Sequence, residues 1–176
     1  MPSLSMIRSD SMIPSASMIG VFGAILTALV LLIGVMTAIS AAARGFSQGP
    51  PPLQFLVIPL GDMLVFAILF GTALYFRRRM QVHKRLMLLA ALSLLTPAIA
   101  RIPFQFIETG GPLIFFGFTD LGVLACVAFD ALKHRRVHPA FLWGTLLIVS
   151  SQPLRLMLAP TDVWLRFAAA LVGLAR

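Results

Sequence analysis

The run MIGVFGAILTALVLLIGVMTAISAAA, residues 18–43, contains no charged residue and decides the fold class. About 20 apolar residues in a helix cross a hydrocarbon core of roughly 30 Å, so this run is long enough to span a membrane. The rest of the chain agrees, because 59% of its 176 residues are hydrophobic and only 11% are charged. We therefore expect an all-α, polytopic transmembrane helix bundle rather than a soluble domain.

Four further apolar runs indicate about five spans in total. They cover residues 53–76, 86–107, 113–132 and 139–158. The turn ETGGP at 108–112 is expected to end the third span, since glycine and proline interrupt helices. A cleaved signal peptide is the rival interpretation of the first run, but its apolar core is longer than the usual 7 to 15 residues.

The two ends of the chain differ from the spans. Residues 1–17 are rich in serine and methionine and predict a flexible tail, which leaves 18–176 as a single transmembrane domain. Near the C-terminus, 163–174 would form a helix only about 18 Å long. We expect this segment to be a short interfacial or re-entrant helix.

The charge of the chain predicts its orientation. Its net charge of +8 is concentrated in the second and fourth connections, at Arg77–Arg79, Lys84, Arg85, Lys133 and Arg135–Arg136. Lysine and arginine in short loops favour the cytoplasmic side, so the N-terminus is predicted to be cytoplasmic. The placement between apolar runs indicates contact with the lipid bilayer and its anionic lipids, not nucleic acid. Twelve arginines against two lysines suggest a bacterium, and hence its inner membrane.

Four charged residues lie inside the predicted spans, one on each of four helices. Counted from the basic ends, Asp62, Arg101, Asp120 and Arg155 lie about 20 to 24 Å deep. A charge at a helix centre costs roughly 2.5 to 3.5 kcal/mol on insertion scales, so such residues face the bundle interior and find partners. We predict that the two acids and two bases meet in one charge layer.

Polar residues and prolines extend this prediction to a candidate ligand site. Ser93, Gln105 and Gln152 are expected near the charges, and a polar stripe along the third span would continue to the outer surface. Prolines at the same level free backbone carbonyls that need donors or water. The sequence therefore predicts a hydrated pocket that opens outward.

The histidines suggest no catalytic or metal site. His83 and His138 are the pair with which a bundle would bind a b-type haem, although both flank basic loops. His134 and His138 have the spacing of a metal pair, but Pro139 starts a new helix and breaks that geometry. No phosphate loop or nucleophile motif is present, so no cofactor and no catalytic residue is predicted.

The stretch FRRRMQVHKRLMLLAALSLLTPAIARIPF, residues 76–104, resembles a group of short bacterial multi-pass membrane proteins without an assigned activity. In that group a basic loop leads through His-Lys-Arg-Leu-Met into an apolar helix that ends with an arginine. The stretches FGFTDLGVLACVAFD and VHPAFLWGTLLIVSSQPLRL are similar to the same group. The resemblance implies the architecture and these positions to test: His83, Arg85, Arg101, Asp120, His138 and Arg155.

Three functions remain open from the sequence. The first is an accessory or structural membrane subunit, in which the charge layer fixes helix packing within a larger membrane complex. The second is a small-ligand or proton-coupled transporter or sensor that uses the polar pocket. The third is a haem- or quinone-linked redox protein.

Overall fold

The computed structural model describes the backbone of residues 16–47, 50–100 and 105–174, and the side chains of 20–47, 50–100 and 112–174. Within these ranges the chain is all-α and contains no strand. Eight helical elements follow one another: α1 (Ala16–Ala43), α2 (Pro52–Phe55), α3 (Val57–Tyr75), α4 (Met80–Ser93), α5 (Leu95–Ile99), α6 (Gln105–His134), α7 (Pro139–Leu158) and α8 (Asp162–Leu174).

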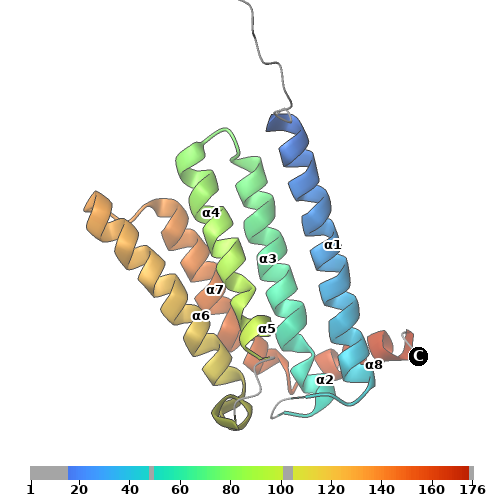
Figure 1. Cartoon of the computed structure of the whole chain (residues 1–176). Helices are drawn as coiled ribbons and strands as arrows, with labels where there is room; N and C mark the ends of the chain where they lie inside the picture. Colours follow the sequence, from blue (N-terminus) through green and yellow to red (C-terminus); the bar gives the residue numbers. More distant parts are fainter. Residues whose placement is uncertain (1–15, 48–49, 101–104, 175–176) are drawn as a thin grey trace, which may run out of the picture.

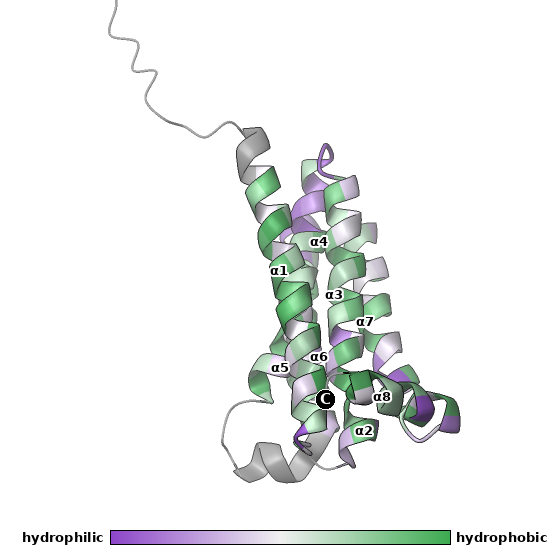
Figure 2. Cartoon of the chain, turned by 90° about the vertical axis from the view of Figure 1, so that its right-hand side faces the viewer, coloured by the Kyte–Doolittle hydropathy of each residue, from purple (hydrophilic) through white to green (hydrophobic). Residues whose placement is uncertain are grey.

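Five helical segments of the described chain are long and apolar enough to cross a membrane, which confirms a multi-pass membrane protein. The first lies in α1, the second combines α2 and α3, and the third combines α4 and α5. The fourth and fifth lie in α6 and α7. Figures 1 and 2 show these segments side by side, with hydrophobic residues along their length.

The predicted boundary between the third and fourth spans is wrong. The third span ends at Ile99, and α6 begins at Gln105 and continues through the predicted turn at 108–112. Pro112 is tolerated inside α6, as prolines are in membrane helices when other groups satisfy the freed carbonyl.

Helices α3, α4 and α7 form the centre of the bundle. Their buried apolar side chains, including Leu69 and Leu89, make one continuous core. Gly144 on α7 permits this close approach, since a Cβ at that position would overlap with Leu89 Cδ1. The core therefore holds the three helices together at the level of Gly144.

The short helix α8 lies across the end of the bundle, near α1 and α2 (Figures 1 and 2). Thr161 caps the N-terminus of α8, because its Oγ1 accepts a hydrogen bond from the Trp164 backbone N–H at 3.3 Å. The Trp164 indole Nε1–H donates to the Leu53 carbonyl at 2.9 Å and fixes α8 to α2. A short helix outside the set of candidate spans agrees with the predicted fold.

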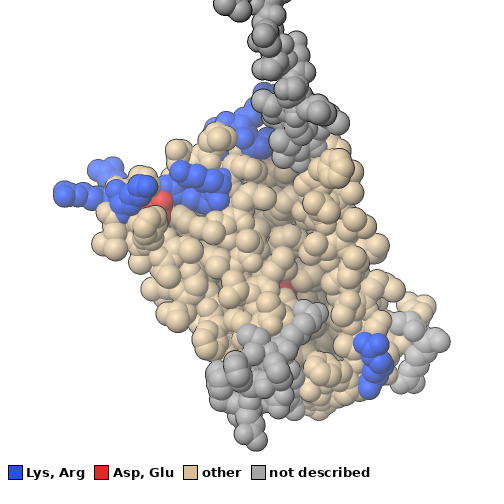
Figure 3. Space-filling view, in the orientation of Figure 1, with Lys and Arg blue, Asp and Glu red and all other residues tan. Residues whose placement is uncertain are grey.

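Lysine and arginine side chains gather at one end of the bundle (Figure 3). The α3–α4 and α6–α7 connections both lie at that end, as does the beginning of α1 (Figure 1). The two basic loops are therefore on the same side of the bundle. The short α8 lies at the opposite end.

Candidate functional site

The central feature of the site is a buried ion pair between α3 and α7. Arg155 Nη1 donates to Asp62 Oδ1, and the two side chains are only 8% and 4% exposed. Each charge sits within an apolar span and would cost several kcal/mol without a partner. The contact neutralises both and joins two helices that are 93 residues apart in sequence.

The surroundings of Arg155 fix its position. Its Nη2 donates to Ser151 Oγ at 2.8 Å, one turn earlier on α7. Its guanidinium carbon lies 5.8 Å from the centre of the Phe116 ring on α6. Gly61 leaves room for the aliphatic stem, because a Cβ there would lie only 2.5 Å from Arg155 Cδ. The arginine thus contacts three spans.

A second polar contact joins α6 to α7. Gln152 Nε2 donates to Asp120 Oδ1 at 2.7 Å. Gln152 and Arg155 lie three residues apart on α7, so they share a face and belong to the same polar level. Next to Asp120, Thr119 Oγ1 lies 2.8 Å from Thr96 Oγ1, and both threonines are buried.

The predicted charge layer is thus present in part. Asp62 and Arg155 pair directly, whereas Asp120 pairs with Gln152. Arg101 lies outside the described residues, and of Gln105 only the backbone is described. The described charges do not form a single four-membered cluster.

The predicted polar stripe along the third span stays a prediction. Its described part lies in α4 and α5, Gln105 belongs to α6, and residues 101–104 between them lie outside the described residues. Ser93 is buried, and its Oγ donates to the Ala90 carbonyl within its own helix.

The ion pair lines none of three cavities in the described part of the chain. Three cavities, of about 100, 510 and 350 Å³, have linings that include neither Asp62 nor Arg155, Asp120 or Gln152. An outward-opening hydrated pocket at these charges is therefore not among them. The second carboxylate oxygen of the pair, Asp62 Oδ2, is buried without a hydrogen-bond partner among the described residues.

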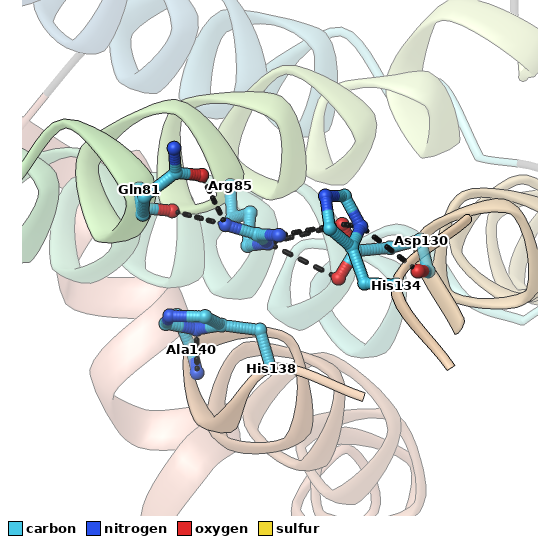
Figure 4. A network of polar contacts seen from close by, with 6 residues as sticks. All are labelled: Gln81, Arg85, Asp130, His134, His138 and Ala140. Atoms are coloured by element: carbon cyan, nitrogen blue, oxygen red, sulfur yellow. Dashed lines mark hydrogen bonds and ion pairs between the residues drawn. The ribbon is translucent and has the colours of Figure 1, made fainter. Parts of the chain in front are cut away.

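A second buried ion pair, which sequence reasoning missed, lies at the basic end of the bundle (Figure 4). Arg85 donates through Nε and Nη2 to the Asp130 carboxylate, with Nη2 to Oδ1 at 2.7 Å. Arg85 Nη1 also donates to two acceptors on Gln81, the backbone carbonyl oxygen and the side-chain Oε1. The sequence places Arg85 in a basic connection and does not predict an acidic partner for it. The signal that could have found the pair is Asp130, a lone acid at the basic end of an apolar helix.

The three histidines lie at this same end and have separate roles. His83 Nδ1 lies 2.7 Å from the Ala73 carbonyl, to which it donates. His138 Nδ1 instead accepts from the Ala140 N–H at 3.1 Å and caps α7. Burial lowers the pKa of His138 below its usual range, and the Arg85 guanidinium adds to the shift. Haem binding by His83 and His138 stays a prediction.

The described residues contain no group of three or more His, Cys, Asp or Glu that could hold a metal ion. His134 Nδ1 lies 3.2 Å from Asp130 Oδ1, and that carboxylate is already held by Arg85. Asp130 is therefore held by its ion pair with Arg85 and lies within hydrogen-bonding distance of His134.

No family model matches the chain, and neither curated proteins nor solved structures give a match. Membership of the group with the His-Lys-Arg-Leu-Met motif stays a prediction.

Proposed function

We propose that this chain is a non-catalytic accessory subunit of a larger membrane complex, and that its intramembrane charges hold its own spans in register. The observation that carries the proposal is the closed Asp62–Arg155 pair, whose side chains are 4% and 8% exposed. A site that binds a transported ion or substrate needs charged groups that the ligand can reach. Here the two charged groups are paired with each other and buried.

The partner-binding surface in this proposal is the first half of α1. Among the described residues of α1, those that are buried lie near its C-terminal end, at Ala38, Ile39 and Ala42. Among the described residues, no atom lies within 4 Å of a Cβ built at Gly20 or Gly23. Small residues allow a neighbouring membrane helix to approach closely, so a partner span is proposed to pack here.

Substitution of Gly23 tests this surface. Gly23→Leu is expected to reduce the chain's recovery in a species larger than itself after mild-detergent extraction, while its melting temperature is retained. Gly71→Leu is the matched control, since a Cβ at Gly71 also meets no described atom within 4 Å. Recovery of the wild-type chain only as a monomer would contradict the accessory role. Equal assembly of both variants would contradict the α1 surface.

The cellular placement belongs to the same proposal. The chain is proposed to lie in a bacterial inner membrane with its N-terminus in the cytoplasm. The support is that both basic connections lie at one end of the bundle, together with the start of α1. Cysteines introduced at Arg78 and Arg136 should be protected from an impermeant thiol reagent added to intact cells. Labelling of both cysteines would show that the basic connections face the outside, which contradicts the proposed orientation.

Proton-coupled transport or sensing is the second candidate, and one observation favours it. Asp62 Oδ2 is buried without a hydrogen-bond partner among the described residues. This oxygen is the atom on which the carboxyl group could carry a proton. Vesicles containing the chain and an internal pH dye would test it. Proton uptake that is absent in Asp62→Asn, with equal insertion, would favour this candidate over the accessory role.

A further inference from the structure

The largest of the three cavities is an apolar groove between α3, α4 and α7, with a volume of about 510 Å³. Leu69 of α3 and Leu147 and Trp143 of α7 are among its apolar walls. Trp143 is 72% exposed, so one side of the groove opens to the surroundings of the bundle. The polar side chains of the lining are Thr72, Arg79 and His138.

The polarity of the groove changes along its length. Arg79 precedes α4 and His138 caps α7, so both lie at the basic end of the bundle. Leu147 lies about 14 Å further along α7, in the apolar part of the span. Thr72 adds no polar site inside, because its Oγ1 donates to carbonyls of its own helix. The groove is therefore cationic at its mouth and apolar within.

The two polar groups at the mouth can both donate hydrogen bonds. The Arg79 guanidinium lies 5.9 Å from the Phe76 ring centre and forms no ion pair with a described acid. His138 Nδ1 accepts from Ala140, so a neutral ring carries its proton on Nε2. The lowered pKa of His138 favours this neutral form at pH 7. Nε2–H has no partner among the described residues and remains a donor.

We infer that this groove binds an anionic phospholipid, with its phosphate at Arg79 and His138 and one acyl chain along the apolar walls. The occupant must be negative at one end and apolar over a long remainder, which is the chemistry of such a lipid in a bilayer. Neighbouring cations at the same end, including Arg77 and Lys84, increase the attraction for a negative headgroup. This inference goes beyond the proposed function and does not depend on it.

Lipid binding to the purified full chain in a neutral detergent tests the inference. Thermal shift and native mass spectrometry would compare phosphatidylglycerol, phosphatidylcholine with the same acyl chains, and inorganic phosphate. We expect phosphatidylglycerol to raise the melting temperature and remain bound as one or two adducts. Phosphatidylcholine should bind more weakly, and phosphate alone should cause no shift. Equal effects of the two lipids, or an equal effect of phosphate, would overturn the inference.

Paired variants separate the groove from general surface charge. Arg79→Gln should weaken phosphatidylglycerol binding about tenfold, the loss expected for one charge-assisted hydrogen bond. Arg78→Gln removes the same charge from the adjacent position, which is outside the lining, and should change binding little. Leu147→Trp should also weaken binding because the indole fills the groove, whereas Leu146→Trp should not. Equal losses in the members of either pair would contradict a specific site.

Discussion

Gly61 shows how a single residue positions the buried arginine. Its missing side chain leaves the space that the Arg155 stem occupies. Depth counting placed Asp62 and Arg155 at one level together with Arg101 and Asp120, but it did not point to the glycine next to Asp62. That role depends on which helix lies opposite, and a single sequence does not contain this information.

Gly61→Ala is therefore expected to destabilise the bundle. A Cβ would lie 2.5 Å from Arg155 Cδ and Nε, so the arginine must move away from Asp62. Overpacking of this kind costs about 1–3 kcal/mol. Thermal unfolding in detergent measures it, with Gly71→Ala as the control, because a Cβ there meets no atom within 4 Å. An unchanged melting temperature for Gly61→Ala would show that the arginine can relocate freely.

His138 gives the chain a pH-dependent helix cap. Its folded pKa is lowered by burial and by Arg85, so the unfolded chain binds a proton more readily than the folded one. The stabilisation is present above the unfolded pKa of about 6.5 and is lost as the pH falls below it. Protonation also removes the Nδ1 acceptor that Ala140 uses.

The melting temperature should therefore fall between pH 7.5 and pH 5. In His138→Asn, which keeps a cap acceptor without a titrating group, the fall should be smaller. Melting curves of the two proteins across this pH range make the comparison. Identical pH profiles of the two proteins would show that His138 does not cause the fall in melting temperature.

At the scale of elements, hydropathy located the spans but misplaced one connection. Five apolar runs correspond to five spans because length and composition alone satisfy the requirement of a bilayer. Glycine and proline at 110–112 predicted a break, yet α6 continues through them. A membrane helix tolerates these residues when its neighbours satisfy the backbone, and those neighbours are a tertiary feature.

The Arg85–Asp130 pair joins α4 to α6 at the basic end. Both residues are buried, at 4% and 8% exposure, and removal of the acid leaves the guanidinium with its hydrogen bonds to Gln81 and the Phe141 ring at 5.9 Å. We expect Asp130→Asn to lower the melting temperature by several degrees and to increase proteolysis of the α6–α7 connection. Lys133→Gln, a charge change on the same helix outside the pair, should have little effect. Equal stability of Asp130→Asn and wild type would mean that the pair contributes nothing.

At the scale of the whole molecule, the pairing of charges across spans could be predicted only in part. Depth counting brought Asp62 and Arg155 to one level, and the structure joins them. It could not say which acid meets which base, because the choice depends on helix rotation. Asp120 therefore meets Gln152, a neutral partner that was expected near the charges but not assigned to an acid.

The central claim is that the Asp62–Arg155 pair serves packing rather than a ligand. A double-substitution cycle of Asp62→Leu and Arg155→Met, followed by thermal unfolding in detergent, tests it most directly. Each single change should cost about 3–5 kcal/mol, because it leaves one buried charge without a partner. The double variant, in which both charges are gone, should recover most of this loss and assemble like the wild type. A double variant as unstable as the sum of the two single changes would contradict it.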